Sequence, residues 1–202
     1  MQRWGFGQPR FERFLQLGAT VVIASRREAV LRSAADEMMA SHGGTVVPIA
    51  CDVRDPEMVE AMIERAWTQC GGVDGLVNNA AGNIAAPTER LSHRAVDSVL
   101  GIVLHGSMYC TLALGKRWLA AKRKGRVLSI VTTYAEGGSA YVVPSAAAKA
   151  GVLAMTRSLA VEWGGRGITC NAIAPGPFPT KGAWERLLPD PSLMDAAIDR
   201  IP

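Results

Sequence analysis

The sequence predicts an α/β fold built around a doubly wound parallel sheet. Short apolar runs rich in β-branched residues alternate with longer stretches whose apolar residues recur at helical spacing. Glycine pairs and polar turn residues separate the two kinds of segment. This alternation is typical of βαβ units, in which helices cover both faces of a parallel sheet through right-handed crossovers. Since no linker or repeat interrupts the pattern, we expect one domain spanning residues 1–202.

Taken in order, the elements begin and end at recognisable residues. Gly18 suits the end of a first helix, and the pairs Gly43-Gly44 and Gly71-Gly72 end the next two. Ser92 caps a long fourth helix, and Pro144 suits the first turn of a fifth. The expected strands are 19–25, 45–50, 73–79, 126–131 and 168–174; the expected helices are 11–17, 28–39, 56–67, 92–122 and 145–163, with helical patches in 180–202.

Composition narrows the class of protein. The 202 residues suffice for an α/β domain with a sizeable core, and 49% hydrophobic with 20% charged residues is ordinary for a globular protein. The net charge of +4 is spread along the chain. Its densest basic cluster, at 122–126, follows the long fourth helix, where cations suit the C-terminal end. We therefore favour a solvated helix end over a nucleic-acid site.

Cysteine and histidine spacing argues against metal and disulfide chemistry. The four cysteines are widely separated without a Cys-x-x-Cys pair, and the three histidines lack metal-ligand spacing. No apolar run reaches the roughly 20 residues that span a bilayer, and the first residues do not resemble a secretory signal. We expect a cytoplasmic protein that binds neither a metal nor a membrane.

A candidate catalytic cluster follows the strand at 126–131. Tyr134 comes just past the strand end, which is the edge of a parallel sheet where ligands bind. Ser145 and Lys149 are four residues apart on a predicted helix, so they project from one face. A lone Ser-x-x-x-Lys is more often ordinary surface or core. The surroundings therefore decide whether the phenol, hydroxyl and ammonium converge on one site.

Other strand ends fit a Rossmann-like dinucleotide fold. Arg26 follows the strand at 19–25, where an acidic residue would bind a ribose hydroxyl and an arginine accommodates a 2′-phosphate, which favours NADP over NAD. Asp52 can accept a hydrogen bond from an adenine amino group. Asn79 opens a run of small residues, to 82, that lets the backbone approach a cofactor closely. The turn Pro175-Gly176-Pro177 could wall one side of a nicotinamide ring.

With these residues in place, the chain resembles the short-chain dehydrogenase/reductase superfamily over nearly its whole length. The matching motifs are 52–53, 78–82, Lys149 and 175–176. Most of that superfamily has a tyrosine where this chain has Ser145. The 2,4-dienoyl-CoA reductase branch shares the serine and places its tyrosine upstream, as here. The runs that resemble this branch are 79–83, 87–91, 132–136, 143–146, 160–164 and 175–183.

The resemblance implies reduction of a 2,4-dienoyl-CoA thioester to a 3-enoyl-CoA by NADPH. Tyr134 and Asn83 would hydrogen-bond the thioester carbonyl, Lys149 would hold the nicotinamide ribose, and Ser145 would complete the polar cluster. The resemblance also implies two further sets of contacts, one to the acyl-CoA and one to the cofactor. Arg54 and Arg186 would contact the acyl-CoA, and Gly5, Phe6, Gly7 and Phe178 would join the cofactor site. A homo-oligomer, commonly a tetramer, is implied likewise.

The chain departs from the family at three places. His105 stands where the family usually has an asparagine that helps hold a water near the lysine; the imidazole either does the same or is a buried, satisfied histidine. Gly5 and Gly7 match the last glycines of the phosphate-binding turn, whereas the first glycine and the first strand are absent. The match also stops before the last helix and strand. We therefore expect a fragment whose central strands lose ladder hydrogen bonds.

Two other functions remain open at this point. The same cofactor site would serve a reductase of a keto or hydroxyl group on another substrate. An incomplete phosphate turn would instead leave an inactive or binding-only chain. Assays with a panel of substrates and measurement of NADPH binding would distinguish these two functions from the dienoyl-CoA reductase.

Overall fold

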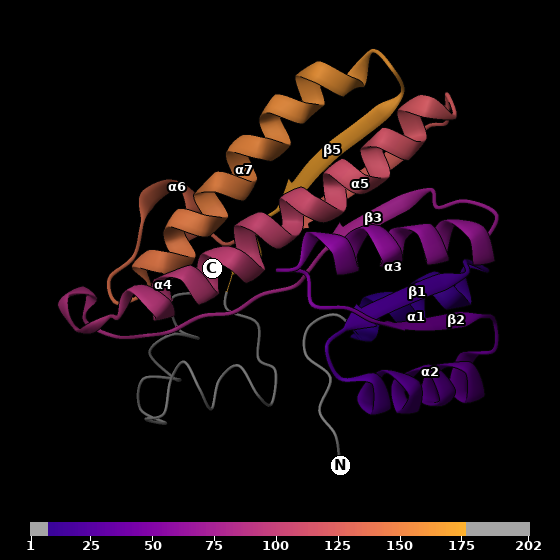
Figure 1. Cartoon of the computed structure of the whole chain (residues 1–202), viewed down its shortest axis with the longest axis horizontal. Coiled ribbons are helices and arrows are strands. Elements are labelled where there is room, and N and C mark those ends of the chain that lie inside the picture. Colours follow the sequence, from indigo (N-terminus) through magenta and orange to yellow (C-terminus); the bar gives the residue numbers. More distant parts are fainter. Residues whose placement is uncertain (1–7, 177–202) are drawn as a thin grey trace. The chain divides into compact units, whose positions relative to one another are not determined.

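The computed structural model describes residues 8–176 and shows the predicted α/β fold (Figure 1). Its chain divides into two compact units. The first takes in the residues up to Ile49 together with Pro175 onward, and the second runs from Ala50 to Ala174. Each unit contains strands with helices packed on them, which confirms the alternation predicted from the sequence.

The first unit carries two of the five described strands. Its elements are α1 (Gln8–Gln16), β1 (Val21–Ser25), α2 (Glu28–His42) and β2 (Val46–Ala50), and β1 and β2 pair with each other. Leu31 on α2 and Ile23 on β1 belong to one buried cluster with Leu15, because each projects its apolar face inward. Gly43 ends α2 with a φ of 67°, in the left-handed region that glycine adopts without strain.

The second unit is built on the parallel sheet β3-β4-β5. The register pairs Asn78 at the end of β3 with Ser129 near the end of β4, so the carboxyl ends of these strands lie together. The elements are α3 (Pro56–Gln69), β3 (Gly75–Asn78), η1 (Thr88–Arg90), α4 (His93–Leu100), η2 (Gly101–His105), α5 (Gly106–Ala120), β4 (Gly125–Ile130), α6 (Tyr134–Gly137), α7 (Val143–Gly164) and β5 (Ile168–Ile173).

Among the described strands, only β4 has a hydrogen-bonded neighbour on both sides. The expectation that the chain is a fragment stays a prediction. All five expected strands are present, and each begins and ends within two residues of its predicted bounds. The short helices η1 and α6 are additions that apolar periodicity could not predict, because each is at most four residues long.

One long helical segment passes through the core of the second unit. It runs as α4, a π-helical turn η2 and α5, from His93 to Ala120. By length and hydropathy this segment could cross a membrane, which the sequence analysis did not expect. Half of its most apolar window is buried inside the protein, as in a core helix, and Val103 within the turn is fully buried.

The structure excludes one of the two alternatives predicted for His105, the buried histidine. The His105 side chain is exposed and lies near Tyr109, with ring centroids 6.1 Å apart. It is therefore not a buried, satisfied histidine. Val103, two residues earlier, instead supplies the buried side chain of this turn.

Candidate active site

Tyr134 and Ser145 form the central pair of the site. Tyr134 begins α6 just past the end of β4, and Ser145 lies in the first turn of α7. Their side-chain oxygens are 3.1 Å apart, a hydrogen bond in which either hydroxyl can donate. Ser145 is buried and Tyr134 is half-buried. The structure thus joins two residues that are eleven positions apart in the sequence and that were predicted to converge.

Lys149 lies one turn further along α7 and is 6% exposed. Its Nζ donates to the backbone carbonyl of Ile130, the last residue of β4. Burial removes water from the ammonium and lowers the pKa of Lys149 from 10.5 to about 8. The lysine is therefore fixed at the carboxyl end of β4 and changes charge near physiological pH.

Thr132 is a site residue that the sequence analysis did not single out. It lies between Ile130 and Tyr134, and its Oγ1 is buried without a hydrogen-bond partner in the described part of the chain. A buried hydroxyl without a partner is costly, and such groups cluster where ligands bind. Its position two residues before Tyr134 at a strand end is the signal that could have found it. An unsatisfied hydroxyl here fits a site that takes a polar ligand.

The loop after β3 brings the predicted asparagines to the same edge of the sheet. Asn78, at the end of β3, donates to Thr111 Oγ1 at 2.9 Å and to Ser129 Oγ at 3.4 Å, which ties the strand end to α5 and β4. Asn79 is half-buried and Asn83 is exposed. Within the described residues no hydrogen bond joins Asn83 to Tyr134, so the structure places its loop but not its amide.

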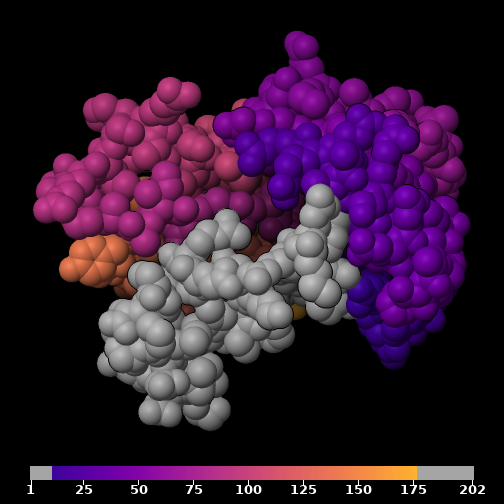
Figure 2. Space-filling view, turned by 90° about the horizontal axis from the view of Figure 1, so that it is seen from below, coloured from indigo at the N-terminus to yellow at the C-terminus, as the bar shows by residue number. Residues whose placement is uncertain are grey.

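The backbone of this loop is nevertheless tied to the loop before α7. The Ala86 N–H donates to the Tyr141 carbonyl at 2.9 Å. Figure 2 shows the orange surface of the loop before α7 next to the magenta surface that includes α4. The loop that carries Asn83 and the loop between α6 and α7 are thus neighbours at the surface of the second unit.

Asp52 and Arg54 are paired with each other. The Arg54 side chain donates to both oxygens of Asp52, from Nε at 3.0 Å and from Nη2 at 2.5 Å, and the Arg54 backbone N–H donates at 3.1 Å. The hydrogen bond and the charge of the carboxylate raise the pKa of Arg54. Strand-end position and family resemblance predict separate ligands for these residues, adenine for Asp52 and acyl-CoA for Arg54. In the structure they form one ion pair past the end of β2.

The other residues predicted to bind cofactor or substrate lie either in the first unit or outside the described residues. Arg26 follows β1 and is exposed, as is Arg27, which precedes α2 without a side-chain capping bond. Pro175 and Gly176 follow β5. Gly5, Phe6, Gly7, Pro177, Phe178 and Arg186 lie outside the described residues.

The cysteines of the described chain are all free thiols. Burial raises the pKa of Cys51 to about 11 and that of Cys110 to about 12, so both stay protonated at neutral pH. A protonated, buried thiol is a poor nucleophile. No group of three or more His, Cys, Asp or Glu side chains could hold a metal ion within residues 8–176.

Comparison with known proteins gives this geometry a context. A family model described as enoyl-(acyl carrier protein) reductase matches residues 2–202. A probable 2,4-dienoyl-CoA reductase of Caenorhabditis elegans is 46% identical over 91% of this chain and 60% of the relative. A Bacillus subtilis protein with the name probable 2,4-dienoyl-CoA reductase is 39% identical over 98% of this chain and 78% of the relative.

Solved structures agree with the family match. A short chain dehydrogenase from Bacillus anthracis superimposes with a TM-score of 0.82 at 45% identity, over 86% of this chain and 72% of that one. The chain spans about 60% of the length of the Caenorhabditis elegans relatives that it matches.

Proposed function

The chain belongs to the short-chain dehydrogenase/reductase family, and we propose that it is an NADPH-dependent reductase that converts 2,4-dienoyl-CoA thioesters to 3-enoyl-CoA. One observation carries the proposal: the 3.1 Å hydrogen bond between Tyr134 and Ser145. A tyrosine upstream of α7 paired with a serine on α7 is the arrangement that the dienoyl-CoA reductase resemblance implies. The names of the relatives point to the same substrate class.

The reaction needs a donor at the thioester oxygen. A bound nicotinamide cofactor would supply hydride to the far end of the conjugated diene. The electrons of the diene would shift toward the thioester, whose oxygen gains negative charge, and a proton from solvent would add at C2 to give the 3-enoyl product. The Tyr134 hydroxyl would donate to that oxygen, and its 3.1 Å hydrogen bond to Ser145 Oγ supports this role. The amide of Asn83 would be the second donor.

Positioned donors of this kind act on the transition state. The negative charge on the oxygen grows only as the hydride is transferred, so a donor fixed in advance stabilises the transition state more than the substrate. Ser145 is buried and anchored on the long helix α7, so it can hold the phenol without rearrangement.

The cofactor is proposed to lie against the end of β4. The buried ammonium of Lys149 would donate to ribose hydroxyls, and the Thr132 hydroxyl, which lacks a partner among the described residues, would gain one. Arg26 would neutralise the 2′-phosphate that distinguishes NADPH from NADH. Its place near the start of α2 supports this role, since a cation there opposes the helix dipole and contributes little to the helix.

Replacement of Tyr134 tests the proposal. Tyr134→Phe keeps the ring and removes the donor, so kcat with a 2,4-dienoyl-CoA should fall roughly 10²–10³-fold, the usual cost of losing one such donor. NADPH oxidation, followed by its absorbance, gives kcat and KM, and calorimetry gives NADPH affinity, which should change little.

Tyr109→Phe is the matched control, because it removes a phenol hydroxyl from α5, away from the proposed donors. Its kcat should stay close to that of the wild type. Unchanged kcat in Tyr134→Phe would remove the assigned role. Turnover of ketones without turnover of dienoyl thioesters would favour the alternative of a keto or hydroxyl substrate.

Two properties of the whole protein are proposed on other grounds. The free cysteines of the described residues suit a reducing, cytoplasmic setting. The homo-oligomer rests on the family resemblance alone.

A further inference from the structure

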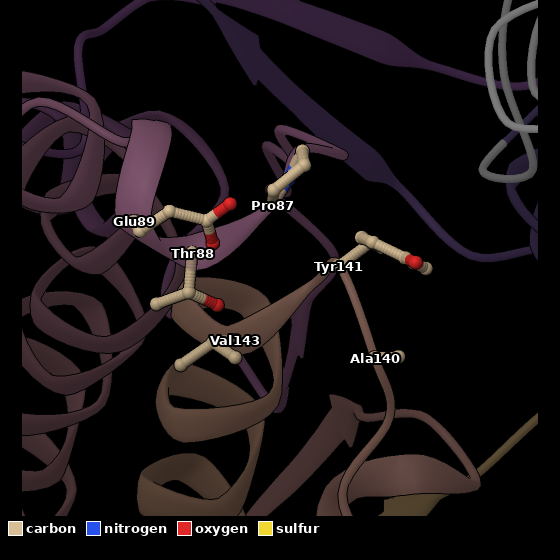
Figure 3. A pocket seen from close by; sticks show the side chains of 6 residues that line it. All are labelled: Pro87, Thr88, Glu89, Ala140, Tyr141 and Val143. Atoms are coloured by element: carbon tan, nitrogen blue, oxygen red, sulfur yellow. The ribbon is translucent and has the colours of Figure 1, made fainter.

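A pocket opens between η1 and the loop that precedes α7, entirely within the second unit (Figure 3). Its volume of about 460 Å³ lies in the range of small-molecule sites. In Figure 3, Thr88 and Glu89 lie on one side with Val143, and Tyr141 lies on the other with Ala140. Pro87 completes the lining.

Tyr141 holds an unusual conformation at this pocket. Its φ of 64° is in the left-handed region, which a bulky residue seldom adopts. Its carbonyl accepts the Ala86 N–H at 2.9 Å, which fixes the loop in that shape. Such conformations persist only where the surroundings hold them, and they cluster at ligand sites. The result is an aromatic side chain, 61% exposed, at the mouth of the pocket.

The lining selects the chemistry of the ligand. The Pro87 ring, the Ala140 methyl and the side chain of Val143 are apolar, and Val143 is 45% exposed although it is aliphatic. The one charged group of this lining is the carboxylate of Glu89, which repels phosphates. The lining is therefore part apolar and part polar, since Thr88 and Glu89 lie opposite Tyr141. Its carboxylate disfavours the anionic parts of a cofactor or of coenzyme A, and its apolar side chains can take an uncharged hydrocarbon.

The residues that line the pocket are close in sequence to those of the candidate active site. Val143 begins α7 two residues before Ser145, so their Cα atoms are at most about 7 Å apart. Pro87 follows Asn83 by four residues on the loop after β3. The walls of the pocket thus come from the loop that carries Asn83 and from the segment that joins α6 to α7.

We propose that this pocket binds the distal hydrocarbon part of the acyl chain and that Tyr141 is a specificity-determining residue for chain length. The proposal rests on the proposed function, because a thioester held at Tyr134 and Ser145 would bring the acyl chain close to Val143 at the start of α7. The Tyr141 ring covers the methylenes beyond the diene and removes them from water.

Binding of unreactive substrate analogues tests the pocket without the reaction. Saturated hexanoyl-, decanoyl- and tetradecanoyl-CoA are titrated into the full chain by calorimetry. Each buried methylene strengthens binding about fourfold, so partial burial should make decanoyl-CoA bind at least about tenfold tighter than hexanoyl-CoA. Tyr141→Gly, which suits the positive φ, should abolish most of this gain and leave hexanoyl-CoA affinity within about twofold. Tyr141→Phe should preserve the gain.

A second variant covers the opposite wall. Val143→Asp places a charge in the pocket and should also remove the length dependence, while Val161→Ala, at a residue 87% exposed on α7, should not. Circular dichroism checks that each variant is folded. Affinity that is independent of chain length in the wild type, or a gain that survives both Tyr141→Gly and Val143→Asp, would overturn the proposal.

Parallel assays with 2,4-hexadienoyl- and 2,4-decadienoyl-CoA separate the two proposals. Reduction of both with equal kcat/KM, and no change in Tyr141→Gly, would refute the pocket while the proposed function stands. Length-dependent binding that Tyr141→Gly abolishes, without reduction of either thioester, would support the pocket while the proposed function fails.

Discussion

Lys149 shows how burial sets the chemistry of a single residue. Its ammonium donates to the Ile130 carbonyl, which favours the charged form, yet loss of hydration outweighs that bond and the pKa falls to about 8. The resemblance assigns this lysine a cationic role beside the cofactor ribose. Its charge is therefore available at neutral pH and is lost in mildly alkaline solution.

The stability of the protein should record this shift. The native state binds fewer protons at Lys149 than the unfolded state between pH 8 and 10.5, so stability rises with pH across that window. Below pH 8 the charged lysine costs roughly 3 kcal/mol, the free-energy equivalent of the shift. We expect Lys149→Met to be more stable than the wild type by up to about that amount at pH 7, and by progressively less toward pH 10.5.

Urea unfolding of both proteins at several pH values across that window measures the difference. Taking the difference cancels the titration of other groups. A gap that is constant with pH would contradict the burial argument. The Lys149→Met variant leaves the Ile130 carbonyl without its donor, so the observed gain should be somewhat below the full amount.

Spacing alone could predict Tyr134, Ser145 and Lys149, because a strand end and a four-residue helical interval place them on one edge. It could not predict that Asp52 binds Arg54. A carboxylate two residues from an arginine pairs with it only if the backbone turns there. It also could not show that the Thr132 hydroxyl lacks a partner within the described chain, since that depends on every atom around it.

At the scale of elements, the contact between α5 and α7 depends on a missing side chain. Gly115 on α5 is buried, and a Cβ at this position would overlap the indole ring of Trp163 on α7. Trp163 is itself 5% exposed, so the ring has little room to move. The glycine thus lets the two helices approach at the expense of helix propensity.

Gly115→Ala should therefore destabilise the protein although alanine is the better helix former. Overpacking a buried contact costs about 1–3 kcal/mol, against a gain of about 1 kcal/mol in propensity. We expect a net loss of up to about 2 kcal/mol in the free energy of unfolding, measured by urea denaturation.

Gly164→Ala supplies the comparison, because Gly164 ends α7 and an added Cβ there would meet no side chain of the described residues within 4 Å. That variant should be neutral or slightly stabilised. Equal effects of the two substitutions would show that propensity, and not packing, decides at Gly115.

Helical periodicity predicted α5 and α7 but not their contact. Each helix has apolar residues at the right spacing, which fixes the face that it buries. The π-helical turn η2 was also not predictable, since the residues of Gly101–His105 have the same spacing as an ordinary helix. Hydrogen bonds one residue longer than usual leave no mark in the apolar pattern.

At the scale of the whole molecule, the residues proposed for the reaction and for the pocket are all in the second unit. Tyr134, Ser145, Lys149 and Asn83 lie between Ala50 and Ala174. Arg26, which would recognise the 2′-phosphate, belongs to the first unit. Substrate chemistry and cofactor choice are therefore assigned to different parts of the chain, and can be tested separately.

Cofactor binding should stabilise the folded chain, with a preference that depends on Arg26. A ligand at about 100 times its Kd adds about 2.7 kcal/mol, which for a chain of this size raises Tm by about 5–10 °C. We expect NADPH to give such a shift in differential scanning calorimetry and NADH a smaller one at equal concentration. Arg26→Gln removes the cation, so it should weaken NADPH binding about tenfold, the equivalent of one modest charge contact, and leave NADH binding unchanged.

Arg166→Gln, at an exposed arginine of the second unit, should preserve the NADPH shift. If neither nucleotide shifts Tm, the binding-only or inactive alternative gains support, because the residues that would hold the ribose and phosphate would then be present without forming a working site.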